Sequence, residues 1–462
     1  MLLGLPVEEI QERIEGGKLN IAVYGLGRVG LPIAAAWLRA GQKVIGADIS
    51  REVVNKINRG ISPILDEPHI PEAVEKFVKE GKFKVSTDLI KASEESEVKI
   101  IAVPTTSSKR GFDGSALESA LRNIGKGLKE GDGVSIECTV PPNTTEKWAR
   151  NILEEESRLK AEEDFALVFS PERIYEGRAL EDLEERYPKI VGGVGPRSTE
   201  LFSILYSRIA KKGVLKMSSA TAAELAKLFE GIYRDVNIAL ANELAKLCQT
   251  LDVGFTEIRG ASNSQPFCHL HKPGIGVGGP CIPYYPHFIL DTAAERDLPM
   301  PLIKVARTIN EEMPKYTVSL ALKTLNIIGK RFNDVKVAIL GLAFRGNIAD
   351  SRSSPTYDVI DLLEKFNAKI VVHDPLIDHD ETLEKKGIKL VKSLEKAVVG
   401  ASLIIISTDH KEYAEMDLNK IAGMVNKPAA IVDGRNVLKV AQVPRGIYLI
   451  GVGGKTIDRL SN

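Results

Sequence analysis

Residues 21–48 read IAVYGLGRVGLPIAAAWLRAGQKVIGAD, and this stretch decides the fold of the N-terminal part of the chain. Short apolar runs at 21–24 and 44–47 predict two strands, and the apolar segment 31–40, which ends at Gly41, predicts a helix between them. A strand, a helix and a second strand in this order form a βαβ unit, whose strands pair in parallel. The stretch therefore predicts the start of a doubly wound α/β sheet.

The turn between this first strand and the helix carries glycines at the spacing of a dinucleotide-binding loop. Gly25 permits the tight turn, Gly27 lets the backbone approach a pyrophosphate, and Gly30 lets helix and strand pack closely. Asp48 would accept hydrogen bonds from ribose hydroxyls and repel a 2′-phosphate, which favours NAD over NADP. We expect an NAD site here, against the alternative of a purely structural glycine turn. Its expected residues are Gly25, Leu26, Gly27, Arg28, Val29, Gly30 and Asp48.

Composition excludes several classes of protein. Lys+Arg and Asp+Glu both total 62 in 462 residues, and a formal net charge of zero argues against a nucleic-acid partner. No apolar run approaches the ~18–20 residues that a membrane span needs, and the N-terminus turns acidic too soon for a signal peptide. Four cysteines in this length are no disulfide scaffold. We expect a cytoplasmic protein without membrane or nucleic-acid partners.

The strand-and-helix pattern recurs on both sides of a helical middle. Segment 220–252 contains no proline and one glycine, and its apolar spacing predicts a helix of roughly 50 Å that bridges domains or packs against a second subunit. Segment 301–328 predicts a helix kinked or divided at Pro314. Further strands are expected at 99–103, 133–137, 165–169, 189–193, 335–340, 369–373, 403–407 and 430–432, with helices after Ser50 and at 356–366.

This pattern predicts an α/β fold with two Rossmann-like doubly wound domains, joined by a long central helix and a helical middle domain. The expected boundaries are 1–210, 211–325 and 326–462.

The last domain repeats the strand-to-helix corner of the first. Asp374 follows its strand as Asp48 does, but the corner 340–345 lacks the second and third glycines, so a second dinucleotide is not expected. Ser354 and Pro355 begin a helix, and the neighbouring loop arginines, Arg345 and Arg352, either pair with phosphates or are solvated.

Segment 274–281 reads GIGVGGPC, with four glycines in six residues before a cysteine. Such a run costs folding entropy, which suggests a mobile loop whose backbone passes close to a ligand. A Cys281 thiolate could attack an aldehyde and hold its carbon as a thioester, or Cys281 could be a packing residue, as expected for Cys138, Cys248 and Cys268. The Cys and His residues between 268 and 287 match no ligand spacing, so no metal is expected.

Two further positions could carry chemistry. Lys227 shares a helix face with Glu230, Gly231 and Arg234, either as a solvated stripe or as a cationic patch in which Gly231 opens space for a ligand. Glu172, in the motif SPER at 170–173, follows a strand at the edge where α/β ligands bind, and is a candidate polar or general-base group.

The order of these motifs resembles the nucleotide-sugar 6-dehydrogenase family, which comprises the UDP-glucose and GDP-mannose dehydrogenases, over essentially the whole chain. It is most similar to the branch that acts on UDP-N-acetyl-D-mannosamine. The resemblance rests on GLGRVGLP at 25–32, NRG at 58–60 with EP at 67–68, VPT at 103–105, TVP at 139–141, SPER at 170–173, ELAKL at 224–228, YRDVNIALANE at 233–243, GVGGPC at 276–281, GLAFR at 341–345 and DGR at 433–435.

The resemblance implies that the C6 alcohol of a UDP-sugar is oxidised to a carboxylate in a four-electron reaction with two NAD. In this family pattern Cys281 is the nucleophile, Lys227 steadies the oxyanion, Glu172 lies near the reacting carbon and Thr139 lies beside nicotinamide and water. It further implies NAD contacts from Val103, Pro104, Thr105 and Thr139, and substrate contacts from Glu172, Arg173, Lys227, Arg234, Gly276, Gly278, Arg345 and Arg435. A homodimer or a larger homo-oligomer is expected.

The chain departs from the family pattern at four positions. Gly231 stands where asparagine is common, Tyr285 where aspartate is common, and Phe267 where an arginine is often offered to the neighbouring subunit's substrate. Arg345 replaces the more usual lysine. Three alternatives therefore stay open: a UDP-glucose or UDP-N-acetylglucosamine dehydrogenase, a two-electron dehydrogenase without a covalent step, and a non-catalytic nucleotide-sugar binder.

Overall fold

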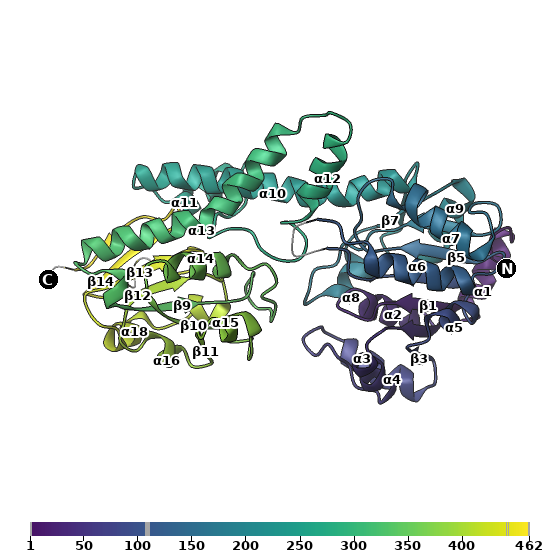
Figure 1. Cartoon of the computed structure of the whole chain (residues 1–462), viewed down its shortest axis with the longest axis horizontal. Helices are drawn as coiled ribbons and strands as arrows, with labels where there is room; N and C mark the ends of the chain where they lie inside the picture. The colour runs from purple at the N-terminus through teal and green to yellow at the C-terminus, as the bar shows by residue number, and fades with distance from the viewer. Residues whose placement is uncertain (1, 107–110, 440, 442, 461–462) are drawn as a thin grey trace. The chain divides into compact units, whose positions relative to one another are not determined.

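The computed structural model describes residues 2–106, 111–439, 441 and 443–460. The chain divides into two compact units, 1–230 and 231–462, and the boundary falls within the long helix α10 (Ala220–Thr250). Figure 1 traces both units, each with helices packed around a sheet. Among the described residues, no helix has the length and apolar character that crossing a membrane requires.

The N-terminal unit contains, in its described part, a sheet with the strand order β3-β2-β1-β4-β5-β6-β7-β8. The pairing is parallel except between β6 and β7, which run antiparallel. The strands are β1 (Asn20–Tyr24), β2 (Lys43–Ala47), β3 (Phe83–Ser86), β4 (Val98–Ile101), β5 (Gly133–Ile136), β6 (Ala166–Phe169), β7 (Lys189–Gly193) and β8 (Val214–Lys216). The order confirms the doubly wound prediction, but β3 and β8 were not predicted, and the expected strand 99–103 ends at Ile101.

Helices cover both faces of this sheet because alternate residues of its strands point to opposite sides. Ile21 and Val23 of β1 belong to one hydrophobic core, and Ala22 and Tyr24 belong to the other. The Ser50 side chain accepts a hydrogen bond from the Val53 amide, which confirms the expected cap. The helices are α1 (Val7–Glu15), α2 (Gly30–Arg39), α3 (Arg51–Asn58), α4 (Ile70–Lys79), α5 (Leu89–Glu94), α6 (Ser115–Gly127), α7 (Arg150–Ser157), α8 (Ala179–Glu181), α9 (Pro196–Ser207) and the π-helical turns η1 (Thr144–Ala149) and η2 (Asp182–Arg186).

The C-terminal unit contains a second sheet, with the described order β11-β10-β9-β12-β13-β14-β15, parallel except for β15. Its strands are β9 (Lys336–Leu340), β10 (Lys369–His373), β11 (Lys389–Val391), β12 (Ala401–Ile406), β13 (Ala429–Asp433), β14 (Ile447–Gly451) and β15 (Ile457–Asp458). Its shorter helices are η3 (Phe332–Asp334), α14 (Pro355–Glu364), α15 (Glu381–Lys385), α16 (Leu394–Val398), α17 (Lys411–Ala414) and α18 (Leu418–Met424). The expected strands of the last domain are confirmed to within two residues at each end.

The helical segment consists of α10, α11 (Phe255–Ser262), α12 (Tyr285–Ala294) and α13 (Pro301–Ile327). The helix is not divided at Pro314, because α13 runs through the proline, and the other alternative, a kink there, stays a prediction. A proline removes one main-chain hydrogen bond, and here buried residues on either side, Met313 and Thr317, keep the helix packed. Asp235 of α10 also ties the two long helices together, accepting hydrogen bonds from Arg307 at 2.9 Å and Asn310 at 2.8 Å.

Candidate active site

The glycine corner of the N-terminal unit has the shape that a dinucleotide needs. Gly25 has a φ of +84°, and a Cβ on Gly30 would lie 1.8 Å from the Gly25 carbonyl oxygen. A Cβ on the exposed Gly27 would meet no atom within 4 Å. Gly25 and Gly30 are therefore required by the fold, whereas Gly27 leaves its backbone open toward a ligand. The buried Leu26 and the half-buried Val29 complete the turn.

Asp48 lies at the end of β2 and braces the same turn. Its carboxylate accepts hydrogen bonds from the Leu26 amide at 2.7 Å and the Ser50 amide at 2.8 Å. The side chain is half-buried, and an ionised carboxylate has about four acceptor positions. Asp48 therefore holds the loop and keeps acceptor capacity for two ribose hydroxyls.

The other expected NAD residues surround this corner. Arg28 pairs with Asp66 through two contacts, at 3.0 and 3.2 Å, so its charge is partly engaged by the protein. The Thr105 hydroxyl donates to the Thr139 carbonyl at 2.6 Å, which joins the loops after β4 and β5. In the same two loops, Val103 and Thr139 are half-buried and Pro104 is exposed.

Glu172 rests on a buried ion-pair network. Its Oε2 accepts from Lys189 Nζ at 2.9 Å and its Oε1 accepts from the Arg173 amide at 2.6 Å. Lys189 also donates to Glu137 Oε2 at 2.6 Å, and Tyr206 donates its O–H to Glu137. Two carboxylates and one ammonium group thus share a site in which no side chain is more than 5% exposed.

The segment after β6 is fastened to α10 beside Glu172. Lys227 donates its ammonium group to the Glu172 carbonyl oxygen, and Arg173 pairs with Glu230 at 2.8 Å. Glu67, from the motif after α3, accepts from the Gly177 and Ala179 amides and holds the other end of the segment. The structure therefore brings Glu172, Arg173 and Lys227 together within the N-terminal unit.

In the C-terminal unit, the glycine run 274–279 packs tightly, which corrects the expectation of a mobile loop. A Cβ on Gly276 would lie 2.9 Å from Pro355, and a Cβ on Gly278 would lie 2.6 Å from the Ser353 carbonyl oxygen. A Cβ on Gly279 would lie 2.8 Å from the Phe344 ring. The glycines let the backbone approach the corner at the carboxyl edge of the second sheet.

The same corner carries the expected substrate arginines. Arg435 donates to the Ser407 carbonyl at 2.9 Å and the Phe344 carbonyl at 3.2 Å, and a Cβ on Gly274 would lie 2.6 Å from its guanidinium group. Burial lowers the pKa of Arg435 by more than the nearby Asp409 raises it. Arg345 is half-buried at this corner. Gly276, Gly278, Arg345 and Arg435 therefore lie in one region of the C-terminal unit.

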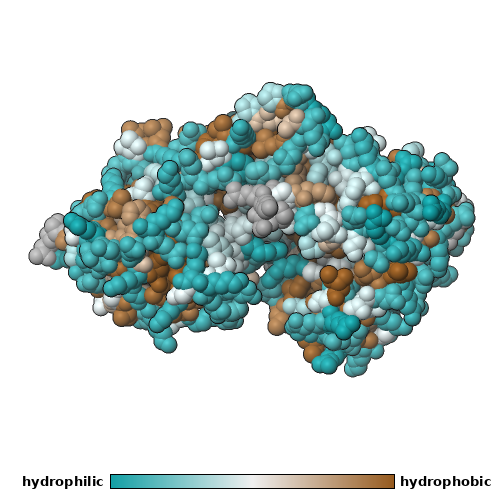
Figure 2. All heavy atoms as spheres, in the orientation of Figure 1, coloured by the Kyte–Doolittle hydropathy of each residue, from teal (hydrophilic) through white to brown (hydrophobic). Residues whose placement is uncertain are grey.

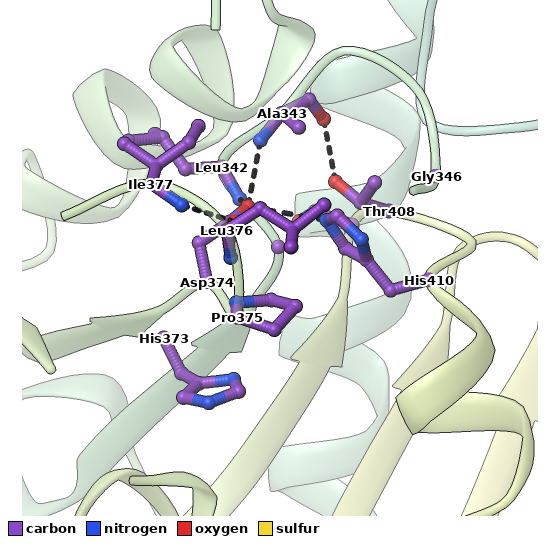
Figure 3. A network of polar contacts seen from close by, with 12 residues as sticks. Leu342, Ala343, Gly346, His373, Asp374, Pro375, Leu376, Ile377, Thr408 and His410 are labelled. Atoms are coloured by element: carbon purple, nitrogen blue, oxygen red, sulfur yellow. Dashed lines mark hydrogen bonds and ion pairs between the residues drawn. The ribbon is translucent and has the colours of Figure 1, made fainter. Parts of the chain in front are cut away.

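Asp374, the counterpart of Asp48, forms its hydrogen bonds with groups of the protein itself. Figure 3 shows its carboxylate at the centre of a polar network, where it accepts from the amides of Leu342, Ala343, Leu376 and Ile377 at 2.8–3.1 Å. The main-chain N–H of Asn347 donates a hydrogen bond to His410 Nδ1, which is therefore the nitrogen without a proton. His410 Nε2 carries the proton and donates to Asp374 at 3.2 Å.

This network fixes the charge of Asp374. Burial opposes its ionisation, but the hydrogen bonds from His410 and the amides lower its pKa to about 2. The carboxylate is fully buried and its acceptor positions are filled, which explains in physical terms why this corner does not repeat the ribose contact expected of Asp48.

Two of the departures from the family pattern contact each other. A Cβ on Gly231 would lie 2.5 Å from the ring of Tyr285, which is 4% exposed. The expectation that Gly231 opens space for a ligand is therefore wrong, because the tyrosine fills that space. The third departure, Phe267, is 90% exposed.

Polar residues of the long helix hold the segment that leads to Cys281, a role that sequence reasoning missed. Asn237 Oδ1 accepts from the His271 amide at 3.1 Å, and Asn242 Oδ1 accepts from the Gly274 amide at 2.9 Å. For Asn242, the available signal was its position seven residues after Asp235 in an otherwise apolar helical stripe, and no such signal marked Asn237. Arg234 is half-buried on the same helix.

The four cysteines differ in burial. Cys138 and Cys248 are buried, as expected, and burial raises the pKa of the Cys138 thiol to about 12. Cys268 is only half-buried, which corrects the expectation of a core residue, because it lies in an open turn with its Sγ 3.5 Å from Asn263 Oδ1. Cys281 is half-buried, and its carbonyl accepts from the Tyr284 and Tyr285 amides at 3.0 and 3.1 Å.

Comparisons with known proteins agree with this geometry. Three family models match: the NAD binding domain of the UDP-glucose/GDP-mannose dehydrogenase family at residues 19–210, its central domain at 221–312 and its UDP binding domain at 338–440. UDP-N-acetyl-D-mannosamine dehydrogenase from Pyrococcus horikoshii is 38% identical, over 94% of this chain and 99% of its own.

Two solved structures are similar over nearly the whole chain. The UDP-D-ManNAc dehydrogenase structure from Pyrococcus horikoshii has a TM-score of 0.86 at 36% identity, covering 94% of this chain and 99% of its own. An NDP-N-acetyl-D-galactosaminuronic acid dehydrogenase from Methanosarcina mazei has a TM-score of 0.82 at 33% identity, covering 98% of both chains.

The chain therefore belongs to the UDP-glucose/GDP-mannose dehydrogenase family, a class of nucleotide-sugar dehydrogenases. It is an oxidoreductase that acts on a CH–OH group of a UDP-sugar with NAD as the acceptor. An NAD-binding domain and a UDP-binding domain are separated by a helical central domain, which confirms the fold class.

Proposed function

We propose that this enzyme oxidises the C6 hydroxyl of UDP-N-acetyl-D-mannosamine to a carboxylate in two steps, through a covalent bond to Cys281. The relatives named for this activity support the substrate. The observation that carries the proposal is the packing of loop 274–281 on the UDP-binding domain, because that contact keeps a half-buried thiol with the domain that holds the nucleotide.

The open backbone at Gly27 and the spare acceptor capacity of Asp48 fit NAD. We assign the pyrophosphate to Gly25, Gly27 and the start of α2, and the ribose to Asp48. When bound, NAD supplies the hydride acceptor, and two molecules are used in succession.

The chain's own residues carry out the remaining steps. Loss of a hydride and of the hydroxyl proton converts the C6 alcohol to an aldehyde. The Cys281 thiol adds to this aldehyde, with Sγ bonding to the carbon and a proton passing to the oxygen, and loss of a second hydride and of the hydroxyl proton converts the thiohemiacetal to a thioester. Water adds to the thioester and the C–S bond breaks, which releases the carboxylate and restores the thiol. Lys227 stabilises the oxyanion, Glu172 acts as the polar or general-base group near C6, and Thr139 orients the water.

The ratio of NADH formed to sugar consumed tests the covalent route. We expect a ratio of two for the wild type, and for Cys281→Ser we expect binding of the UDP-sugar without four-electron turnover. Cys268→Ser, which changes the other half-buried cysteine, should keep the ratio of two. A ratio of one in the wild type would identify a two-electron dehydrogenase, and full turnover by Cys281→Ser would overturn the role of this thiol. Binding of both ligands without turnover at any pH would identify a non-catalytic binder.

A panel of nucleotide sugars tests the substrate. We expect the highest kcat/KM with UDP-N-acetyl-D-mannosamine, compared with UDP-glucose, UDP-N-acetylglucosamine, UDP-N-acetylgalactosamine and GDP-mannose. The Methanosarcina mazei relative, which covers 98% of this chain, makes an N-acetylgalactosamine nucleotide the second candidate. A higher kcat/KM for that sugar would replace the first assignment.

We propose that α10 joins two copies of the chain. The residues Phe229, Tyr233, Leu240 and Leu247 of α10, and Leu251 directly after it, are each at least 44% exposed and recur at intervals of four or seven residues on one side of the helix. Figure 2 shows hydrophobic surface among hydrophilic side chains on the helical segment. A continuous apolar stripe of this kind fits an identical helix from a second copy.

Two expectations complete the proposal. The functional domains run from 1 to 210, 211 to 325 and 326 to 462, with the matched NAD, central and UDP models inside them. The four unpaired cysteines, all in the described part of the chain, support a reducing compartment, and we assign the enzyme to the cytoplasm.

A further inference from the structure

We propose that Lys189 is the positioning residue for Glu172, and that its ammonium group, shared with Glu137, supplies the countercharge of the Glu172 carboxylate and holds it in one orientation. This inference rests on the proposed function, because it gives Glu172 a part in the reaction. It concerns two residues, Lys189 and Glu137, that neither sequence motifs nor the family pattern singled out.

The sheet topology creates the contact. Strand β7 runs antiparallel to β6, with Phe169 opposite Gly192. Continuing this register beyond the end of β6 brings the start of β7, at Lys189, across from Glu172. The Lys189 side chain is 5% exposed and Nζ also lies 3.4 Å from the Pro171 carbonyl oxygen. The backbone thus places the cation under the loop that carries Glu172.

The charges around Lys189 do not balance. Glu137 from the end of β5 and Glu172 from the loop after β6 contribute two negative charges, and Lys189 contributes one positive charge. From α9, Tyr206 donates its O–H to Glu137, its hydroxyl oxygen lies 2.9 Å from Ser135 Oγ, and its ring lies 5.2 Å from Lys189 Nζ.

Other charged or titratable groups face Glu172 rather than Lys189. Lys227 contacts its carbonyl oxygen, the Arg173 amide donates to its carboxylate, and the Tyr187 hydroxyl bonds the Arg173 carbonyl. Lys189 contacts a Glu172 carboxylate oxygen directly, at 2.9 Å, whereas the Lys227 ammonium group contacts the Glu172 carbonyl oxygen.

Burial and charge explain what this cation does. Burial raises the pKa of Glu137, and Lys189 opposes that effect while Glu172 adds to it. Burial lowers the pKa of Lys189, but the two carboxylates outweigh burial and leave it raised. Without the ammonium group, two buried carboxylates would face each other without a countercharge, which disfavours the ionisation of both at once. Lys189 thus supplies the countercharge that the two carboxylates share.

Two variants test the inference in opposite directions. In Lys189→Met, we expect the acidic limb of the pH profile of kcat/KM to move up by ~1–3 pH units. In Glu137→Gln, where Lys189 faces Glu172 alone, we expect that limb to move down. The double variant should lie between the two. If Lys189→Met does not fold, Glu137→Gln still decides, because an unmoved or raised limb in that variant contradicts the inference.

A matched control separates positioning from stability. Lys99 forms an equally buried ion pair with Asp132 in the same unit, away from Glu172. Lys99→Met should lower the unfolding temperature as Lys189→Met does but leave the pH profile unchanged. A shifted profile in Lys99→Met, or an unchanged one in a folded Lys189→Met, would overturn the assignment.

A measurement without substrate distinguishes this inference from the proposed function. The infrared carbonyl stretch of a protonated carboxyl group, assigned with Glu172→Gln, should appear at neutral pH in Lys189→Met as an increase over the wild type. If this band appears but no UDP-sugar is oxidised by the wild type, the proposed function fails and the positioning role stands. If oxidation proceeds and the band does not appear, the positioning role fails alone.

Discussion

At the scale of single residues, an alanine at each of two glycines of one loop should have different effects on stability and on NAD binding. A Cβ on Gly30 would clash with the Gly25 carbonyl, whereas a Cβ on Gly27 would meet no protein atom. Gly30→Ala should therefore lower the free energy of unfolding by at least about 2 kcal/mol. Gly27→Ala should leave stability within about 0.5 kcal/mol and weaken NAD binding at least tenfold, because the methyl group would occupy the pyrophosphate position.

Thermal unfolding and calorimetric titration with NAD measure the two effects. Loss of stability in Gly27→Ala, or unchanged NAD affinity in that variant, would contradict the assignment of the open backbone to the cofactor.

Glu224 predicts a pH dependence of stability. It is buried at the start of α10 and accepts from the amides of Asn143 and Thr145 at 2.7 and 2.8 Å. Burial raises its pKa to about 7. Because the folded-state pKa lies above the unfolded one, the stability that Glu224 contributes is full below the unfolded pKa and is lost as pH rises through about 7.

Denaturant unfolding at pH 5 and pH 8.5 tests this dependence. The stability advantage of the wild type over Glu224→Gln should shrink by about 1–3 kcal/mol between these two pH values. An advantage that stays constant, or grows with pH, would show that Glu224 is ionised throughout.

At the scale of elements, the packing of α10 against α13 depends on a buried ion pair. Arg307 and Asp235 side chains are 4% and 0% exposed and lie 2.9 Å apart. Arg307→Met leaves the carboxylate without its cation and should cost about 3–5 kcal/mol in denaturant unfolding. The exposed pair of Arg296 and Glu295 is the control, and Arg296→Met should cost less than about 1 kcal/mol. If both variants lowered the free energy of unfolding equally, the Arg307–Asp235 pair would not be what stabilises the packing of α10 against α13.

The elements that sequence could predict are those whose signals are local. The NAD corner depends on Gly25, Gly27 and Gly30 within six residues, and the structure gives each the surroundings expected for its task. The contact between Gly231 and Tyr285 joins positions 54 residues apart, and no periodicity in the sequence relates them. Local sequence patterns predict turns and helices, whereas the packing of segments that lie far apart in the sequence becomes known only from the structure.

Two equivalent acids show the same limit within the candidate site. Asp48 and Asp374 both follow the second strand of a βαβ unit, so sequence treats them alike. The structure shows how they differ. The Asp374 carboxylate accepts hydrogen bonds from four main-chain N–H groups of two loops and from His410 Nε2. The Lys189 network was missed for a related reason, since its members come from the ends of three strands that meet only in the sheet.

At the scale of the whole molecule, the exposed stripe on α10 predicts assembly. The variant Leu240→Lys/Leu247→Lys places two charges on the apolar side of the helix and should convert a dimer to monomers in sedimentation velocity. Val399→Lys, at a residue that is 53% exposed in the C-terminal sheet domain, should leave the mass unchanged. A wild type that sediments as a monomer would contradict the proposed interface.

The seating of segment 274–281 on the second sheet has a mechanical consequence. Cys281 and the corner of the UDP-binding domain belong to the same compact unit, 231–462, so the packing within that unit alone sets how the thiol lies relative to this corner. On the proposed covalent route, the acylated sugar therefore stays with the unit that binds the nucleotide, and spent cofactor leaves from the other unit.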